Sequence, residues 1–288
     1  MGFDIFPDFR TPLKSWTNAL VDHLVVTYGN AFEALSNGLL VVLVALEGAL
    51  RALPPILVIA AVGLLAFAVS RRWLFSLVMA AITWGIGALG MWDQAMQTIA
   101  LILVSVGLSI AIGLPIGVLS ARTRIVRGMV MPVLDLMQTI PSFVYLIPAA
   151  MLFGLGKVPA ILATVIYAMP PLIRLVDLGI REVDDHVVEA SRAFGATRWQ
   201  LLRGVQIPLA LPALMQGINQ TTMMALAMVV IASMIGARGV GETVLVGLQR
   251  NDSGEGLVGG LTIVFLAIVI DRITQVYGRR LQRHRLAG

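Results

Sequence analysis

The stretch MQTIALILVSVGLSIAIGLPIGVLS, Met96–Ser120, contains no charged side chain over its whole length. A helix of roughly this length spans the hydrocarbon core of a bilayer, which is about 30 Å thick and needs about 20 apolar residues. The rest of the chain is similar, because 58% of its 288 residues are hydrophobic and 13% are charged. Globular proteins carry about 25% charged residues. The sequence therefore predicts an all-α integral membrane protein.

Six further apolar segments are long enough to cross a bilayer, so the chain is predicted to have seven spans. They lie near residues 54–70, 73–91, 131–153, 158–177, 208–235 and 257–277. The segment Gly38–Leu50 is shorter and is interrupted by Glu47, so we expect an amphipathic interfacial helix there. Counting it as a span gives an alternative of eight. The predicted organisation is an N-terminal arm over 1–53, a transmembrane domain over 54–278 and a basic tail over 279–288.

Arginine residues mark one side of the predicted membrane protein. They form four groups, each separated from the next by two spans: Arg71 and Arg72; Arg122, Arg124 and Arg127; the loop from Arg181 to Arg203; and Arg279, Arg280, Arg283 and Arg285. Basic residues between spans stay on the cytoplasmic side. We therefore expect all four groups and the C-terminus in the cytoplasm and the N-terminus outside. The arm agrees, because through Arg51 it has five acids and three bases.

Composition and spacing argue against several function classes. The chain has no cysteine, so it lacks disulfides, thiolate metal ligands and a cysteine nucleophile, and its net charge of +5 is spread between spans rather than gathered into a nucleic-acid patch. Gly154-Leu155-Gly156-Lys157 lacks the Ser or Thr and the spacing of a phosphate loop. Asp185 and His186 are helix neighbours that point apart, so no metal site is expected. We expect no catalytic residue and no cofactor on this chain, and the N-terminus has no signal-peptide pattern.

Residues 174–206 form the longest segment predicted on the cytoplasmic side, and the polar loop over residues 181–206 makes up most of it. Asp184 or Asp185 can cap a first helix, and Gly195 stands where a left-handed residue ends it. Thr197, with Gln200 three residues later, forms the capping box of a second helix. The loop has nearly balanced charge, which favours a protein contact over a lipid anchor. A solvated loop between spans is the alternative.

The same loop carries a motif. Glu189-Ala190-Ser191 is followed by Gly195 and then by Ile207-Pro208, and this order resembles the EAA loop of ABC importer permeases. Most of the chain resembles the glycine betaine/proline (quaternary amine) permeases of that class. The likeness is clearest in MQTIPSFVYLIPAAMLFG (Met137–Gly154), YAMPPLIRL (Tyr167–Leu175) and GINQTTMMALAMVVIASMIGARGVGETVL (Gly217–Leu245).

The resemblance implies a type I ABC importer permease fold in a bacterial inner membrane. It implies that the loop docks on a cytoplasmic ATPase, present in two copies, which binds ATP and Mg. It further implies an extracytoplasmic binding protein, a second copy of this chain, and import of glycine betaine, choline, carnitine or proline betaine by alternating access. The docking residues would be Glu189, Ala190, Ser191, Phe194, Gly195, Trp199, Ile207 and Pro208.

Polar residues inside the predicted spans are candidates to line a pathway, because burial in lipid is costly. They are Gln138, Tyr145, Gln216, Asn219, Gln220 and Thr222. Hydrogen bonds between helices are the alternative for this set. Asp135 and Asp271 are expected to cap helices or to pair. An ion-coupled carrier or a channel for a small polar solute is the alternative function, and it would depend on an ion gradient rather than on ATP.

Overall fold

The computed structural model describes the backbone of residues 8–286 and the side chains through Gln275. Helices account for most of the described residues. They are α1 (Arg10–Ala52), α2 (Pro55–Ser70), α3 (Trp73–Ala88), α4 (Trp92–Arg122), α5 (Arg124–Thr139), η1 (Ser142–Tyr145), α6 (Leu146–Phe153), α7 (Lys157–Arg181), α8 (Asp185–Ala193), α9 (Arg198–Leu201), η2 (Leu202–Gln206), α10 (Ile207–Ala232), η3 (Ser233–Ile235), α11 (Val240–Gln249) and α12 (Ser253–Leu286).

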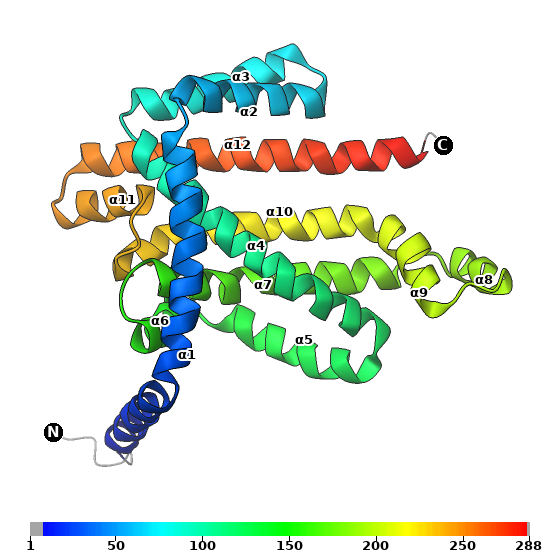
Figure 1. Cartoon of the computed structure of the whole chain (residues 1–288), viewed down its shortest axis with the longest axis horizontal. Coiled ribbons are helices and arrows are strands. Elements are labelled where there is room, and N and C mark those ends of the chain that lie inside the picture. Colours follow the sequence, from blue (N-terminus) through cyan, green and yellow to red (C-terminus); the bar gives the residue numbers. More distant parts are fainter. Residues whose placement is uncertain (1–7, 287–288) are drawn as a thin grey trace.

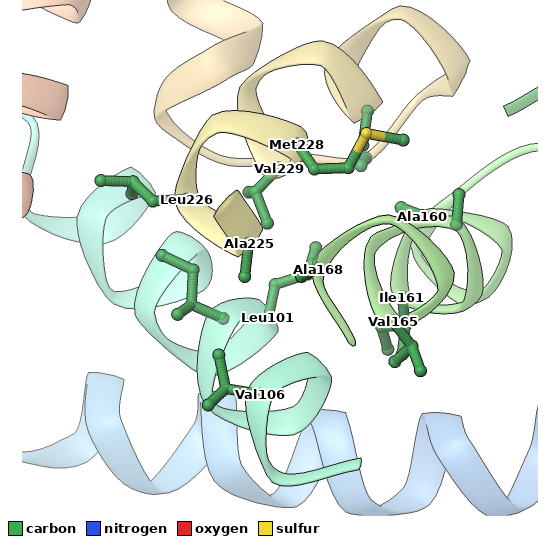
Figure 2. Close-up of a cluster of buried hydrophobic side chains, with 14 of the residues drawn as sticks. Leu101, Val106, Ala160, Ile161, Val165, Ala168, Ala225, Leu226, Met228 and Val229 are labelled. Carbon is green, nitrogen blue, oxygen red and sulfur yellow. The ribbon is translucent and has the colours of Figure 1, made fainter. Parts of the chain in front are cut away.

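Three long helices, α4, α7 and α10, form the centre of the fold, and α12 lies beside α10 (Figure 1). Their core consists of small and aliphatic side chains. Figure 2 shows Leu101 and Val106 from α4, Ile161 and Val165 from α7, and Ala225 from α10 in one buried cluster. Membrane helices associate through such close contacts, because lipid tails offer no hydrophobic driving force for association.

Glycines set the distance between α4 and α7. A Cβ added at Gly113 would lie 3.1 Å from the side chain of Leu172, and one added at Gly117 would lie 2.7 Å from Cβ of Val176. The distance at Gly117 is too short for a side chain, and the one at Gly113 is tight. The pair Gly113-x-x-x-Gly117 is therefore a helix-packing motif in this fold, although Pro115 lies between the two glycines.

The first helix differs from the expected short interfacial segment. Gly38–Leu50 forms the last part of α1, a helix of 43 residues. This helix is long and apolar enough to span a membrane, but it runs across α4, α7 and α10 instead of alongside them (Figure 1). Leu39, Leu43 and Glu47 are its buried residues and face the bundle. The crossing direction is the one that an interfacial helix takes when the bundle spans the bilayer.

The span predicted over 131–153 is broken in the structure. The chain forms α5 and then η1 with α6, and the two parts are bent by 109° at the break. Pro141 lies at this break and follows Ile140, whose backbone is extended. The bend has a local cause, because proline disfavours the helical conformation of the residue before it and cannot donate the next helical hydrogen bond.

The other predicted spans lie in helices. Among the described residues, five helices are long and apolar enough to cross a membrane, or six if the bent pair counts as one span. The segments predicted over 54–70 and 73–91 form α2 and α3, each with 16 residues. At 1.5 Å per residue each covers roughly 24 Å, which is less than the hydrocarbon core. They pack as an antiparallel pair at the side of the bundle (Figure 1).

The four arginine groups lie at one end of the molecule, as the spacing predicted. Figure 1 shows the α2–α3 corner, the α4–α5 corner, the segment with α8 and α9, and the C-terminal end of α12 at the same end of the bundle. Arg71, at the first of these corners, has a left-handed backbone with a φ of +55°. The opposite end carries α6 and α11.

Replacing Gly117 by alanine tests the contact between α4 and α7. The added methyl group overlaps Val176, so we expect Gly117→Ala to lower the stability of the detergent-solubilised protein by about 1–3 kcal/mol. The measurement is the midpoint of thermal unfolding. Gly107→Ala is the matched control, because no atom lies within 4 Å of an added Cβ there. An equal or higher midpoint for Gly117→Ala would contradict the packing role.

Candidate functional site

The loop between α7 and α10 folds into two short helices through the predicted capping residues. The side chain of Asp184 accepts a hydrogen bond from the backbone N–H of His186 at 2.8 Å and starts α8. Thr197 and Gln200 form a complete capping box at the start of α9, with Gln200 Oε1 accepting from the Thr197 N–H at 2.9 Å. Both helix starts were predicted from the sequence.

Gly195 ends the first helix and turns the chain. Its φ of +82° lies in the left-handed region that favours glycine. The N–H groups of Gly195 and Ala196 donate to the carbonyl oxygens of Arg192 and Ser191, at 2.9 and 3.1 Å. This is the Schellman arrangement, which satisfies carbonyl groups at the end of a helix. The corner is therefore fixed by backbone hydrogen bonds.

This segment, the helix–Gly–helix loop over residues 181–206, has a small core of its own. Val183, Val188 and Leu201 are buried together, and Val205 packs against them. Leu202 and Ile207 join a second cluster that contains residues of α7 and α10. The loop is thus packed internally and is also anchored to the two helices that it connects. A displacement of the loop must act on the ends of both helices.

Two aromatic side chains project from the loop. Phe194 is 92% exposed and Trp199 is 57% exposed. The guanidinium carbon of Arg203 lies 5.2 Å from the centre of the Trp199 ring, a cation–π distance. An exposed phenylalanine on a rigid corner is typical of a protein-contact surface, where aromatic side chains fill pockets of the partner.

The remaining residues of the motif lie on either side of that corner. Glu189 and Ala190 are exposed on α8, while the hydroxyl of Ser191 donates to the carbonyl oxygen of Val187. Ile207 and Pro208 begin α10, where the missing N–H of proline costs nothing. Sequence reasoning located all eight motif residues on one short stretch, and the structure places six of them on the loop and two at the start of α10.

A cleft of about 1160 Å³ separates the loop from the α4–α5 corner. Six arginines line it, against the acids Asp185 and Glu189. The arginines are Arg122, Arg124, Arg127, Arg181, Arg192 and Arg198. The sequence did not reveal this cleft, because its residues come from six separate helices. It leaves the loop with space on the side that faces α5.

Helix α5 is held to α7 by charge more than by apolar packing. Within the described part of the chain, Leu134 is the buried residue of α5. Two ion pairs join α5 to α7: Arg127 with Asp177 at 3.3 Å, and Asp135 with Arg174 at 2.5 Å. Asp177 is buried and also lies 3.5 Å from Arg181. The expectation that Asp135 would pair is therefore confirmed.

Three of the predicted pathway residues are exposed. Gln216 and Gln220 lie one turn apart on α10, and Gln138 lies near the end of α5. An exposed amide at the depth of a membrane span is costly against lipid. This face of α10 is therefore better suited to water or to another protein than to the bilayer.

The other three pathway candidates are buried and hydrogen-bonded. Tyr145 donates its hydroxyl to the carbonyl oxygen of Met137, and Thr222 donates to that of Ile218. Asn219 donates to Asp271 at 3.1 Å, which links α10 to α12. These hydrogen bonds, one between helices and two local, agree with the alternative to a pathway-lining role given for these residues.

The end of the bundle opposite the loop is also fixed by polar contacts. Gly154 and Gly156 have φ of +76° and +125° and turn the chain into α7. Lys157, the first residue of α7, donates to Glu47 of α1 at 2.5 Å. The sequence Gly154–Lys157 resembles an incomplete phosphate loop, and in the fold its lysine joins α1 to the bundle.

The segment Gly236–Glu242 lies at the same end. Val240 N–H donates to the hydroxyl of Thr98 at 2.9 Å, so this turn is joined to α4. Among the residues that the structure describes, no group of three or more His, Asp or Glu side chains is placed to hold a metal ion. The helix–Gly–helix loop and the exposed polar faces of α5 and α10 are therefore the features that can carry a function.

Comparisons of the chain with known protein families and with known proteins agree on one family. Residues 113–283 match the model of the binding-protein-dependent transport system inner membrane component family. The chain is 44% identical to the glycine betaine/proline betaine transport system permease protein ProW of Escherichia coli, over 96% of this chain and 78% of that protein. It is 43% identical to the glycine betaine/carnitine transport permease protein GbuB of Listeria monocytogenes, over 93% and 96%.

The fold is similar to that of a solved transporter. A chain of the MetNI methionine ABC transporter, in an inward-facing conformation, matches with a TM-score of 0.59 and 26% sequence identity. The match covers 64% of this chain and 92% of that one. Helices α7 and α10 and the loop between them fall within the region that the family model covers, as does the last part of α4.

Removing the capping box tests whether the second helix of the loop depends on it. Loss of an N-cap side chain costs about 1 kcal/mol, so Thr197→Ala should speed hydrogen exchange of the hydrogen-bonded amides of residues 200–202 about fivefold. Hydrogen-exchange mass spectrometry measures this rate. Thr197→Ser retains the hydroxyl and should exchange at the original rate. Equal protection in both variants would mean that packing alone holds this helix.

Proposed function

The chain belongs to the binding-protein-dependent transport system inner membrane component family. From this premise we propose that it carries a quaternary amine osmolyte across the membrane as a subunit of an ATP-driven importer. It is a permease subunit, a transport component and not a catalytic enzyme. ATP and Mg would bind to a separate ATPase.

The helix–Gly–helix loop is the observation that carries the proposal. It has the motif of the family, a fixed corner and an exposed phenylalanine at its tip. Such a surface suits a docking contact with a cytoplasmic ATPase, with Phe194 and Trp199 as anchors and Glu189 as a hydrogen-bond acceptor. Because the loop is packed on the ends of α7 and α10, movement of the ATPase would reach the central helices directly.

The substrate class comes from the relatives. The names of the two similar permeases share glycine betaine and add proline betaine in one and carnitine in the other. Choline is a further quaternary amine of the same class. Aromatic residues make up 7% of this chain, which leaves little for an aromatic cage around a quaternary ammonium group. Selective capture would therefore take place on an extracytoplasmic binding protein.

A second copy of the chain is supported by the exposed polar residues. Gln216 and Gln220 on α10 and Asp135 on α5 are exposed on the single chain. Lipid is a poor partner for them. In a homodimer these residues would face the second copy rather than lipid, and Gln138, Gln216 and Gln220 would lie along the pathway between the two copies.

The proposed transport cycle is the one that the resemblance to ABC importer permeases implies. A loaded binding protein docks at the end that carries α6 and α11, and ATP closes two ATPase subunits at the end that carries the loop. The loops move together, the central helices open outward and receive the substrate, and hydrolysis returns them inward. In this orientation the loop and the C-terminus are cytoplasmic. The N-terminal arm, tied through Glu47 to the start of α7, is then outside.

Uptake by the reconstituted complex tests the proposal. Proteoliposomes would hold this chain, its ATPase and its binding protein, with labelled glycine betaine or choline outside. We expect uptake that requires enclosed ATP and persists when ion gradients are collapsed. Uptake that follows an ion gradient without ATP would support a carrier and overturn the importer. The solute with the higher ATP-dependent uptake, glycine betaine or choline, is then identified as the preferred substrate.

Gly195→Asp tests docking of the loop. The change strains a left-handed residue and adds a side chain to the contact, so uptake should fall more than about tenfold while membrane insertion stays normal. Gly204→Asp is the matched control, since Gly204 is exposed on the same loop and no atom lies within 4 Å of an added Cβ. Normal uptake by Gly195→Asp would defeat the docking model.

A further inference from the structure

An ion pair joins α5 to α7, which belong to two segments that are long and apolar enough to cross a membrane, and both of its side chains are partly exposed on the single chain. Arg174 of α7 donates through Nη2 to Asp135 Oδ1 of α5 at 2.5 Å. The exposed fractions of the two side chains are 36% for Arg174 and 69% for Asp135. Arg174 comes seven residues before the end of α7, and Asp135 comes 11 residues after the start of α5. The pair is therefore roughly 10–16 Å from the helix ends that carry the loop.

At this depth a charged pair with half of its surface exposed cannot face lipid without a large cost. The exposed side must face water or protein. Gln138 lies three residues from Asp135 on the same face of α5, and Gln216 of α10 lies at the level of Arg174, since Gly217 packs against Leu172 and Leu175 of α7. Two exposed amides thus share the level of the pair.

A carboxylate with a purely structural role in this fold has different surroundings. Asp271 accepts hydrogen bonds from the amide of Asn219 at 3.1 Å and from that of Gln275 at 2.7 and 2.8 Å. Its partners are neutral and come from two sides. Asp135 has one partner and keeps most of its surface free, so both charges of the pair can bind a second group.

The spacing of charges selects the kind of ligand. A cation or an anion alone would satisfy one member of the pair and leave the other unpaired, which is costly away from water. A zwitterion with a carboxylate and a quaternary ammonium group offers one partner to each. The guanidinium of Arg174 is suited to the carboxylate, and the carboxylate of Asp135 is suited to the cationic end.

We propose that Asp135 and Arg174 form a transient binding site for zwitterionic substrates in the pathway, where the substrate inserts its two charges between them. The inference rests on the proposed function, and it names the residues that favour a betaine over choline within the membrane. The substrate carboxylate contacts Arg174 and its ammonium group contacts Asp135. When the substrate leaves, the two side chains pair again. The site is weak because the pair competes with the substrate.

The absence of cysteine from the chain allows a direct test. Gln138→Cys places one thiol a helical turn from Asp135, and Leu136→Cys places one on the apolar face of the same helix. The complex with its ATPase, in lipid nanodiscs, is treated with an uncharged, water-soluble maleimide. Labelling rates are measured without solute and with equal concentrations of glycine betaine, choline or acetate.

We expect glycine betaine to slow labelling of Gln138→Cys at least about fivefold, and choline or acetate to slow it less than about twofold, because one charge cannot satisfy the pair. Leu136→Cys reports any general effect of the solutes and should be unchanged by all three. Adding Asp135→Asn or Arg174→Gln to Gln138→Cys should abolish protection by glycine betaine. Arg127→Gln, which removes the other ion pair between α5 and α7, should preserve it.

Other outcomes overturn the inference. Equal protection by choline and glycine betaine would show that charge matching is absent, and protection that survives Asp135→Asn would make the pair a structural clamp. No protection at all would place the substrate elsewhere. Labelling of Gln138→Cys with Asp135 and Arg174 both intact already distinguishes these outcomes. The test therefore remains decisive even if the Asp135→Asn protein misfolds. Absence of ATP-dependent uptake of any quaternary amine would instead refute the proposed function.

Discussion

The close contact of α4, α7 and α10 is the constraint on which the rest of the fold depends. Glycines allow α4 and α7 to approach until an added Cβ would overlap Val176, and small side chains continue the contact with α10. Because α7 and α10 are consecutive long helices in this contact, the segment between them must lie at one end of the bundle. The helix–Gly–helix loop is thus placed by helix packing and shaped by its own caps.

Around this rigid centre the packing is uneven. α5 follows an extended residue, ends at the bend before Pro141, and is joined to α7 by two ion pairs. Charge pairs can break and form again without opening a cavity, whereas apolar packing cannot. A helix attached in this way, beside a cleft that also borders the loop, is free to change position while the central helices stay in contact. The uneven packing therefore matches the division of labour that transport requires.

Local signals in the sequence predicted local structure well. Asp184, Gly195 and the Thr197–Gln200 pair start and end the loop helices as expected, because each acts on its own backbone. The sequence also located the spans, but it could not give the angle of the bend at Pro141, since proline within a span also occurs in helices that are only slightly bent. Which polar residues face outward depends on the rotation of whole helices, and so Asn219 and Gln220, neighbours in sequence, have opposite surroundings.

The internal core of the loop has a consequence for association. A flexible loop must lose conformational freedom when it binds, and that entropy lowers affinity. Here the valines, Leu201 and the Schellman turn have already fixed the backbone, and Phe194, the proposed anchor, is presented in advance. The loop is therefore preorganised for binding to a partner. In the proposed complex the subunits would separate and rejoin without refolding this segment, and a force applied at its tip would not be absorbed by bending.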